Sequence, residues 1–322
     1  MRSKSLIAVA LLAWSAVCGA QDFPSRPITL IVPAPPGGAT DTIGRALAED
    51  MSKRLGQPII VDNKPGGAGV IAMQTLTRAP ADGYTLLLSH SAPLINTPYL
   101  YAKVPYNVRR DIAFITEVCL GKIVLAVRSE VPAKTVPEFL AWAAQHKGTV
   151  SFGSYGVGSF PHLVGAHLNQ TRGLEMVHVA YKGEAPMVQD MIAGNIAWAI
   201  GSVTTLGPHI KSGRLRALAV MGDKRIKELP GVPTMEEAGM KEQEMRPPAW
   251  VGLLARSGTP AAILTRLETE ARASVKSTVM QSRLDAMALE PVGNTSAEFK
   301  RDFETAEPVM ARLIKSSGAT AE

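Results

Sequence analysis

The chain has 322 residues, a formal net charge of +6 and 2 cysteines. This length predicts roughly two domains and allows a large hydrophobic core. The mild positive charge suits a small anionic ligand. Because the basic residues are spread along the chain rather than gathered into a stripe, we expect no nucleic-acid partner. One of the cysteines, Cys18, lies near the N-terminus in the expected signal peptide, and the single remaining cysteine excludes a multi-cysteine metal site, so we expect no metal.

Residues 1–20 have the pattern of a secretory signal peptide. A basic start and an apolar stretch at residues 6–17 precede a small-residue ending. The apolar stretch is shorter than the ~20 residues that a membrane-spanning helix needs. We therefore expect an exported protein that is cleaved after Ala20. A lipid-anchored cysteine at Cys18 is the alternative.

The segment 24–41, PSRPITLIVPAPPGGATD, predicts a strand, a small-residue loop and a helix N-terminus. Residues 28–32 are rich in β-branched side chains, as a buried strand requires. Prolines end the strand, and two glycines allow a tight turn. Thr40 and Asp41 are each candidates to cap the following helix. The free N–H groups of such a corner suit an anion.

Strand-like and helical segments alternate along the chain, which predicts an α/β fold with mostly parallel sheets. Two further strands, at residues 58–62 and 84–88, also end in small or polar residues. Ser89 and Ser91 follow the second of them. Ligands of open α/β sheets bind beyond the carboxyl ends of the strands. A second unit of similar size covers residues 123–221.

The loop at residues 154–159, SYGVGS, resembles the first corner. Its glycines allow a close backbone approach, Ser159 is a candidate helix N-cap, and Pro161 suits the first helical turn. The functional interpretation is a carboxylate held by N–H groups and hydroxyls at this terminus. The alternative is an ordinary capped loop.

Four other side chains each have two interpretations. His162, in the first turn of that helix, and His90 either face a ligand or are satisfied structural histidines. Tyr181, at the end of a later strand, either contacts a ligand or belongs to a surface turn. Cys119 is either a small buried hydrophobe or a reactive thiol, and the sequence places no histidine beside it.

Motifs of common enzymes are absent from the sequence. No serine has the flanking glycines of a nucleophile elbow, and no lysine lies in a phosphate-binding loop. Pro161 occupies the third glycine position of a dinucleotide-binding pattern. His162 and His167 are five residues apart, whereas a zinc-protease helix needs four. We therefore expect no enzymatic activity and no cofactor.

Nine segments occur in an order that is shared by a known family: PSRPITLIVPAPPGGATD, GQPIIVDNKPGGAG, DGYTLLL, VPAKTVPEFLAWA, SFGSYGVGSFPHLVG, MVHVAYKGEAPMVQDMIAG, PHIKSGRLRALAV, LPGVPTMEEAG and GLLARSGTP. Together they resemble the Bug family, the periplasmic solute receptors of tripartite tricarboxylate transporters. The resemblance implies a type II periplasmic binding protein fold, in which two Rossmann-like lobes joined by a two-strand hinge close on the ligand like a Venus flytrap. The first lobe would comprise residues 21–121 and 223–322, and the second residues 122–222.

The resemblance also implies that the ligand is a small carboxylate, either a di-, tri- or aromatic carboxylic acid. One carboxylate would be held between the lobes by backbone groups. The implied ligand-binding residues of the first lobe are Pro35, Gly37, Gly38, Ala39, Thr40, Asp41, Ser89 and Ser91. Those of the second lobe are Ser154, Gly158, Ser159, His162 and Tyr181.

Two features depart from the pattern of the family. Ala197 and Gly201 occupy positions where aspartates are common, and an aspartate there could receive a ligand ammonium or hydroxyl group. The absence of a carboxylate at Ala197 and Gly201 argues against an amino-acid ligand. Pro36 replaces a small residue and stiffens the first loop.

The implied partners are the membrane subunits of a transporter, and we expect a periplasmic monomer. A membrane sensor is the alternative partner, because reporting a ligand and delivering it both require a closed-lobe surface. Neighbouring genes would distinguish the two. A periplasmic enzyme is the third interpretation.

Overall fold

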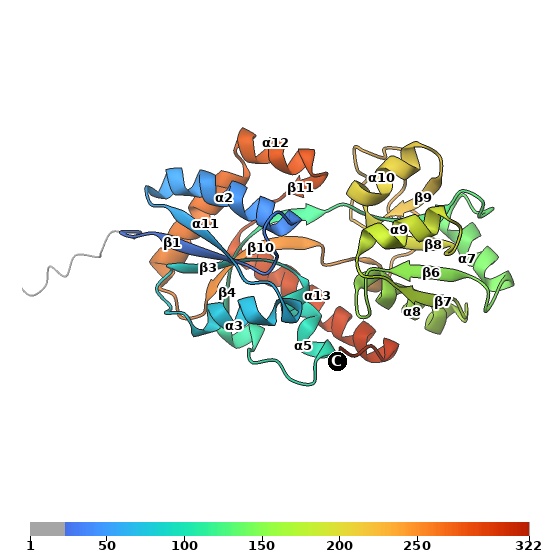
Figure 1. The fold of residues 1–322 in the computed structure, drawn as a ribbon, viewed down its shortest axis with the longest axis horizontal. Coiled ribbons are helices and arrows are strands. Elements are labelled where there is room, and N and C mark those ends of the chain that lie inside the picture. The colour runs from blue at the N-terminus through green and yellow to red at the C-terminus, as the bar shows by residue number, and fades with distance from the viewer. Residues whose placement is uncertain (1–22, 322) are drawn as a thin grey trace, which may run out of the picture.

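The computed structural model describes residues 23–321. The predicted signal peptide, its cleavage after Ala20 and the alternative at Cys18 lie outside these residues. The described chain forms two lobes, each built on one β-sheet (Figure 1). The predicted two-lobed α/β architecture is therefore confirmed. None of the helices between residues 23 and 321 has the length and apolar character to span a bilayer.

The first sheet has the strand order β11-β4-β10-β3-β1-β2. Its strands are β1 (Ile28–Val32), β2 (Ile59–Asn63), β3 (Thr85–His90), β4 (Ile112–Gly121), β10 (Trp250–Arg256) and β11 (Leu289–Pro291). The helices that accompany it are α2 (Ala39–Leu55), α3 (Val70–Arg78), α4 (Ala92–Ile95), α5 (Thr97–Leu100), α6 (Val108–Asp111), α11 (Ala261–Val275), α12 (Thr278–Ala286) and α13 (Ser296–Ser317), with a short 3₁₀ turn η2 (Gly67–Gly69).

The second sheet has the order β7-β6-β8-β5-β9. Its strands are β5 (Ile123–Arg128), β6 (Ser151–Ser154), β7 (Val177–Ala180), β8 (Trp198–Ser202) and β9 (Leu215–Val220). Its helices are α7 (Val136–Gln145), α8 (Phe160–Arg172), α9 (Glu184–Ile192) and α10 (Val203–Lys211). The connector between β9 and β10 is irregular, as its prolines and charges predict, apart from the 3₁₀ turn η3 (Gln243–Met245).

Both sheets are mixed, which corrects the prediction of mostly parallel sheets. Strands β1, β2 and β3 are parallel, but β10 is antiparallel to both β3 and β4. In the second sheet β6, β7 and β8 are parallel, whereas β5 is antiparallel to β8 and β9. Strands β10 and β5, which are antiparallel to their neighbours, lie next to the crossings, and the short strand β11 is also antiparallel to β4.

The chain crosses between the sheets at two places. One crossing is Lys122, between β4 and β5, and the other is the connector between β9 and β10. Ile226 and Leu229 of this connector pack into the core of the second sheet. The lobe boundaries at residues 121/122 and 222/223 remain a proposal.

The two lobes are held together on one side by α13. This helix packs against β4 in the first sheet and against α8 of the second lobe (Figure 1). One hydrophobic cluster runs from Leu87 in the first sheet to Trp198 in the second. Cys119 is fully buried in the first lobe, and burial raises the pKa of its thiol to about 12. Its interpretation as a buried hydrophobe is confirmed.

Candidate functional site

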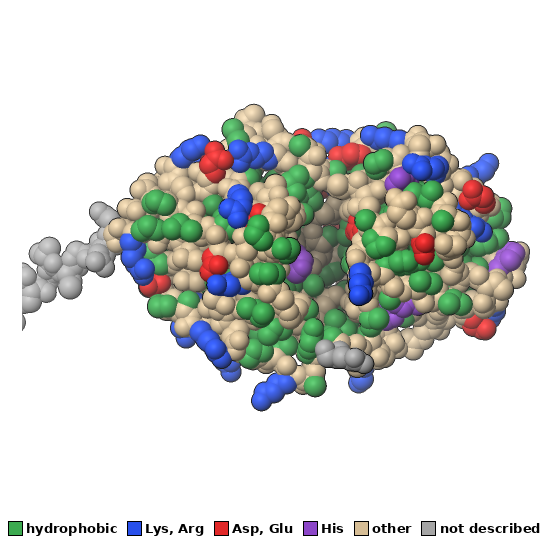
Figure 2. Space-filling view, viewed as in Figure 1, with side chains coloured by type: hydrophobic (Ala, Val, Ile, Leu, Met, Phe, Trp, Pro, Cys, Tyr) green, Lys and Arg blue, Asp and Glu red, His purple; other side chains and the backbone are tan. Residues whose placement is uncertain are grey.

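A cavity of about 530 Å³ lies between the two lobes. Its first-lobe wall includes His90 and Ser91 at the end of β3, and residues of α4 and α5. Its second-lobe wall includes residues 155–160, which follow β6, together with Glu184 and Ser202. Residues 247–251, at the end of the connector and the start of β10, form a third wall. Figure 2 shows the surface hollowed between the lobes. The volume lies within the range of about 300–1,000 Å³ that is typical of small-molecule sites.

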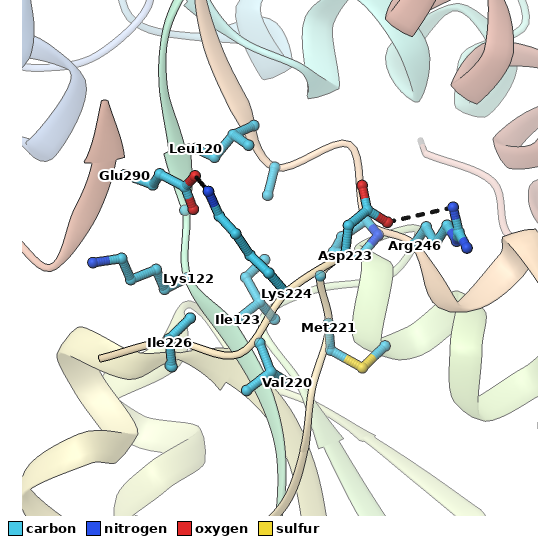
Figure 3. Close-up of a pocket in the computed structure, with 14 residues that line it drawn as sticks. Leu120, Lys122, Ile123, Val220, Met221, Asp223, Lys224, Ile226, Arg246 and Glu290 are labelled. Atoms are coloured by element: carbon cyan, nitrogen blue, oxygen red, sulfur yellow. Dashed lines mark ion pairs between the residues drawn. The ribbon is translucent and has the colours of Figure 1, made fainter. Parts of the chain in front are cut away.

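A second hollow adjoins this cavity at the crossings (Figure 3). It has a volume of about 340 Å³ and shares Gly121, Ile123, Pro247 and Ala249 with the cavity between the lobes. Ion pairs lie along its wall, including one between Lys224 and Glu290. Because these charges are already paired, we assign this hollow to the hinge rather than to the ligand.

The cavity brings together three of the predicted ligand-binding residues, Ser91, Gly158 and Ser159. The amide Nδ2 of Asn96 donates to the Gly158 carbonyl oxygen at 3.1 Å, which joins the two lobes at this point. A side chain at Gly158 would lie 2.5 Å from Leu100 of the first lobe. The second-lobe loop thus lies in direct contact with the first lobe.

The first-lobe loop lies elsewhere in this structure. Pro36, Gly37 and Asp41 line a separate cavity of about 650 Å³ against α12. The other predicted residues of this loop, Pro35, Gly38, Ala39 and Thr40, line neither cavity. Their predicted contact with a ligand stays a prediction.

Asp41 holds the first loop in shape. Its buried carboxylate accepts hydrogen bonds from Gly37 N at 2.8 Å, Arg45 Nε at 2.9 Å and Asn63 Nδ2 at 2.8 Å. The hydrogen bond from Arg45 contributes most to lowering the pKa of this carboxyl to about 2. The prediction that Thr40 or Asp41 is the helix N-cap is wrong. Helix α2 begins at Ala39 with Gly38 as its N-cap, because the Asp41 side chain bonds back to the loop.

Both predicted helix N-termini lack a capping side chain. Gly38, before α2, has no side chain that could cap the helix. Ser159, before α8, does not cap its helix because its hydroxyl donates to the Gly156 carbonyl oxygen at 2.6 Å. By contrast, Thr135 and Ser202 cap α7 and α10. The first N–H groups of α2 and α8 are thereby left for an anion or for water.

Four predicted residues of the two lobes support loops rather than line the cavity between the lobes. The Ser89 hydroxyl donates to the carbonyl oxygen of His90 at 2.9 Å. Ser154 Oγ lies 2.7 Å from His178 Nε2, and the Tyr181 hydroxyl donates to Asp190 at 2.7 Å. His162 Nδ1 accepts from Gly158 N at 3.1 Å. These contacts fix the backbone that faces the cavity.

His162 and His178 form a stacked pair under the second-lobe loop, with ring centroids 4.1 Å apart. Burial lowers the pKa of His162, and burial together with the charge of His162 lowers the pKa of His178 to about 4. The unfolded chain takes up these protons near pH 6.5. Because the unfolded state then binds more protons, the pair reduces stability as the pH falls from about 6.5 to about 4.

Thermal unfolding followed by circular dichroism at pH 7, 6, 5 and 4 checks this expectation. A loss of about 1 kcal/mol lowers the Tm of a chain of this size by roughly 2–4 °C. Glu117 has the opposite effect on the pH dependence. Burial raises the pKa of its carboxyl to about 8, so the stability that it contributes declines as the pH rises toward 8. The difference between the wild type and His178→Gln isolates the histidines. An identical pH dependence in both proteins would contradict the assignment.

Sequence reasoning missed several residues on the cavity wall. They are Asn96, Tyr155, Glu184, Ser202 and Trp250. Tyr155 and Glu184 come after β6 and β7, and Ser202 is the last residue of β8; the carboxyl ends of these three parallel strands meet at one edge of the sheet. Ligands of α/β sheets bind at this edge. The ends of predicted strands were therefore the signal that could have found them.

A two-lobed α/β fold with a cavity between its lobes is the architecture of periplasmic solute-binding proteins. Residues 43–318 match the model of the TctC family, which is described as "Tripartite tricarboxylate transporter family receptor". The chain therefore belongs to the TctC family of periplasmic solute receptors, and the predicted resemblance is confirmed. This is a family of solute-binding receptors, not of enzymes.

Three relatives illustrate the similarity. The protein BugT of Bordetella pertussis is 32% identical over 314 residues, which cover 97% of this chain and 96% of BugT. A TctC solute-binding protein from Polaromonas, solved without ligand, is 30% identical with a TM-score of 0.81, over 91% of this chain and 99% of that one. An R. palustris protein solved with adipate is 29% identical with a TM-score of 0.75, over 92% of this chain and 99% of that one.

Proposed function

We propose that this receptor captures a small carboxylic acid between its lobes and delivers it to the membrane subunits of a tripartite tricarboxylate-type transporter. The observation that carries the proposal is the cavity between the lobes, where Ser91 of one lobe faces the loop with Gly158 and Ser159 of the other. The relative solved with adipate supports a carboxylate as the ligand. Delivery would follow closure of the lobes about the two crossings.

The uncapped N-terminus of α8 is the group that we propose for the carboxylate. Its free N–H groups and the positive end of the helix dipole favour an anion by about 0.3–1 kcal/mol, and by up to about 2 kcal/mol when partly buried. The stacked histidines beneath the loop support it through the hydrogen bond that Gly158 N donates to His162 Nδ1. The receptor acts as a monomer in this proposal.

Isothermal titration calorimetry against mono-, di- and aromatic carboxylic acids tests the proposal. We expect at least one acid to bind with a Kd near 1 μM, about −8 kcal/mol. Ser91→Phe should remove this binding because the added ring fills the cavity. Ser212→Phe makes the same change on an exposed surface and should leave the Kd unchanged. Folded protein that binds none of the acids would contradict the proposal.

Uptake measurements test the second half of the proposal. Cells that lack the receptor should lose uptake of the radiolabelled acid, and the wild-type gene should restore it. Normal uptake in these cells, with tight binding in the calorimeter, would remove the role in transport but leave the binding role intact.

A further inference from the structure

We propose that the receptor selects an acid whose far end carries a hydrogen-bond donor, either a hydroxyl or an ammonium group, and that Glu184 receives this donor. The inference rests on the proposed function, because it presumes that a carboxylic acid occupies the cavity between the lobes. It narrows the ligand to monocarboxylic acids with a donor at the opposite end, and it predicts discrimination against a second carboxylate.

Glu184 places a carboxylate on the cavity wall. Its Oε2 accepts from the Ser202 hydroxyl at 2.6 Å, and its two oxygens lie 3.2 and 3.3 Å from Ser202 N. It is the first residue of α9, where the helix dipole favours a negative charge. A carboxylate only accepts hydrogen bonds and has about four lone-pair positions. Ser202 leaves part of this capacity free for a ligand donor.

The charges around the cavity favour a donor over a second carboxylate. Among the described residues that line it, Glu184 is the acidic one, and there is no lysine or arginine. Partial loss of hydration lowers the pKa of His90, an exposed side chain that also lines the cavity. Lys182 is nearby in the chain, but it is exposed to solvent and does not line the cavity. A second ligand carboxylate would therefore face a like charge with no cation to offset it.

A second acceptor, which has no partner, is buried in the wall of the same cavity. Asn96 is 8% exposed, lines the cavity and has no partner for its Oδ1. Its Nδ2 donates to the Gly158 carbonyl oxygen, which fixes the orientation of the amide. Buried acceptors normally have a donor, so a ligand or a water molecule should supply one here.

The rest of the wall describes the body of the ligand. Leu100, Phe160 and Trp250 present apolar surface, so the part of the acid between its two polar ends should be aliphatic or aromatic. Burial, and then the charge of Glu184, raise the pKa of the Tyr155 phenol, which lines the same cavity. Gly201, at a position where the family commonly has an aspartate, provides no carboxylate. Glu184, which is hydrogen-bonded to the neighbouring Ser202, supplies one instead.

Calorimetry with two matched series of acids tests the inference. The first series is 6-hydroxyhexanoate, hexanoate and adipate, and the second is 4-hydroxybenzoate, benzoate and terephthalate. In the series that fits the cavity, we expect the hydroxy acid to bind at least tenfold more tightly than the dicarboxylate and more tightly than the unsubstituted acid. This ranking is measured on the wild type and needs no variant.

Glu184→Gln should then increase the affinity for the dicarboxylate at least tenfold, since it removes the like charge but keeps an acceptor for Ser202. Glu130→Gln makes the same change of charge at an exposed position of the second lobe and should leave the ranking as it is. A dicarboxylate that binds most tightly to the wild type, with no effect of Glu184→Gln, would overturn this inference alone. If no acid binds, in either series or in the broader panel, the proposed function itself is contradicted.

Discussion

Replacing Gly158 with alanine should weaken ligand binding by about tenfold or more. Gly158 has a φ of +75°, a conformation that costs other residues roughly 1–2 kcal/mol. Its added Cβ would lie 2.5 Å and 2.6 Å from the two Cδ atoms of Leu100. Because Leu100 belongs to the other lobe, this clash pushes the lobes apart at the edge of the cavity. Each 1.4 kcal/mol lost from closure lowers the affinity about tenfold.

Two further variants separate the clash from the backbone strain. Leu100→Ala in the Gly158→Ala background removes the clashing atoms and should restore most of the affinity. Gly156→Ala strains the same loop, where φ is +142°, but its Cβ would have no neighbour within 4 Å. It should reduce the affinity less than Gly158→Ala. Equal losses in the two single variants, with no rescue by Leu100→Ala, would show that the spacing of the lobes at this contact is irrelevant to binding.

Replacing Lys122 with methionine should destabilise the protein by about 3–5 kcal/mol, the usual cost of leaving a buried charge without its partner. The Lys122 ammonium lies 2.8 Å from Glu228 Oε1, and their side chains are only 9% and 18% exposed. The other oxygen of Glu228 has no partner. Although burial opposes it, the hydrogen bond from Lys122 holds the pKa of Glu228 below its usual value. The pair thus fixes the connector against the hinge crossing.

Urea unfolding of four proteins measures this effect. The double variant Lys122→Met/Glu228→Gln removes both charges and should recover most of the lost stability. Lys147→Met breaks an ion pair with Glu175 whose side chains are 49% and 68% exposed, and it should cost no more than about 1 kcal/mol. If Lys122→Met unfolded at the same urea concentration as Lys147→Met, the ion pair between Lys122 and Glu228 would not be a stabilising contact.

Local sequence patterns were sufficient to predict the elements that form the two corners. The β-branched run at Ile28–Val32 is β1, and α8 starts at Phe160, directly after the predicted N-cap position Ser159. The prolines, glycines and periodic apolar residues that define these elements all act within a few positions of the chain. For the same reason, the family segments around both corners could be recognised.

Strand β4 was not predicted, and Glu117 explains why. A carboxylate in the middle of an apolar run argues against a buried strand, yet Glu117 is 3% exposed. Its partner is Asn294, which donates to Glu117 Oε2 at 3.1 Å and accepts from Glu117 N at 2.9 Å. That contact joins residues 177 positions apart, so no local pattern could reveal it.

Glu184 escaped prediction for a similar reason. In the sequence it is an acidic residue in the first turn of a helix, which is a common structural position. Its place on the cavity wall depends on the order β7-β6-β8, in which strands distant in the chain become neighbours. The contact between Asp41 and Asn63, 22 residues apart, was equally out of reach of local patterns, and the ligand-binding role of Asp41 stays a prediction.

The central claim is that a small carboxylic acid binds between the two lobes. A crystal structure with the acid that binds most tightly in the calorimeter tests it directly. We expect the acid in the cavity between Ser91 and Ser159, with its carboxylate at the N-terminus of α8 and its far end at Glu184. Electron density for the acid in the separate cavity between α2 and α12, or outside both lobes, would contradict the claim.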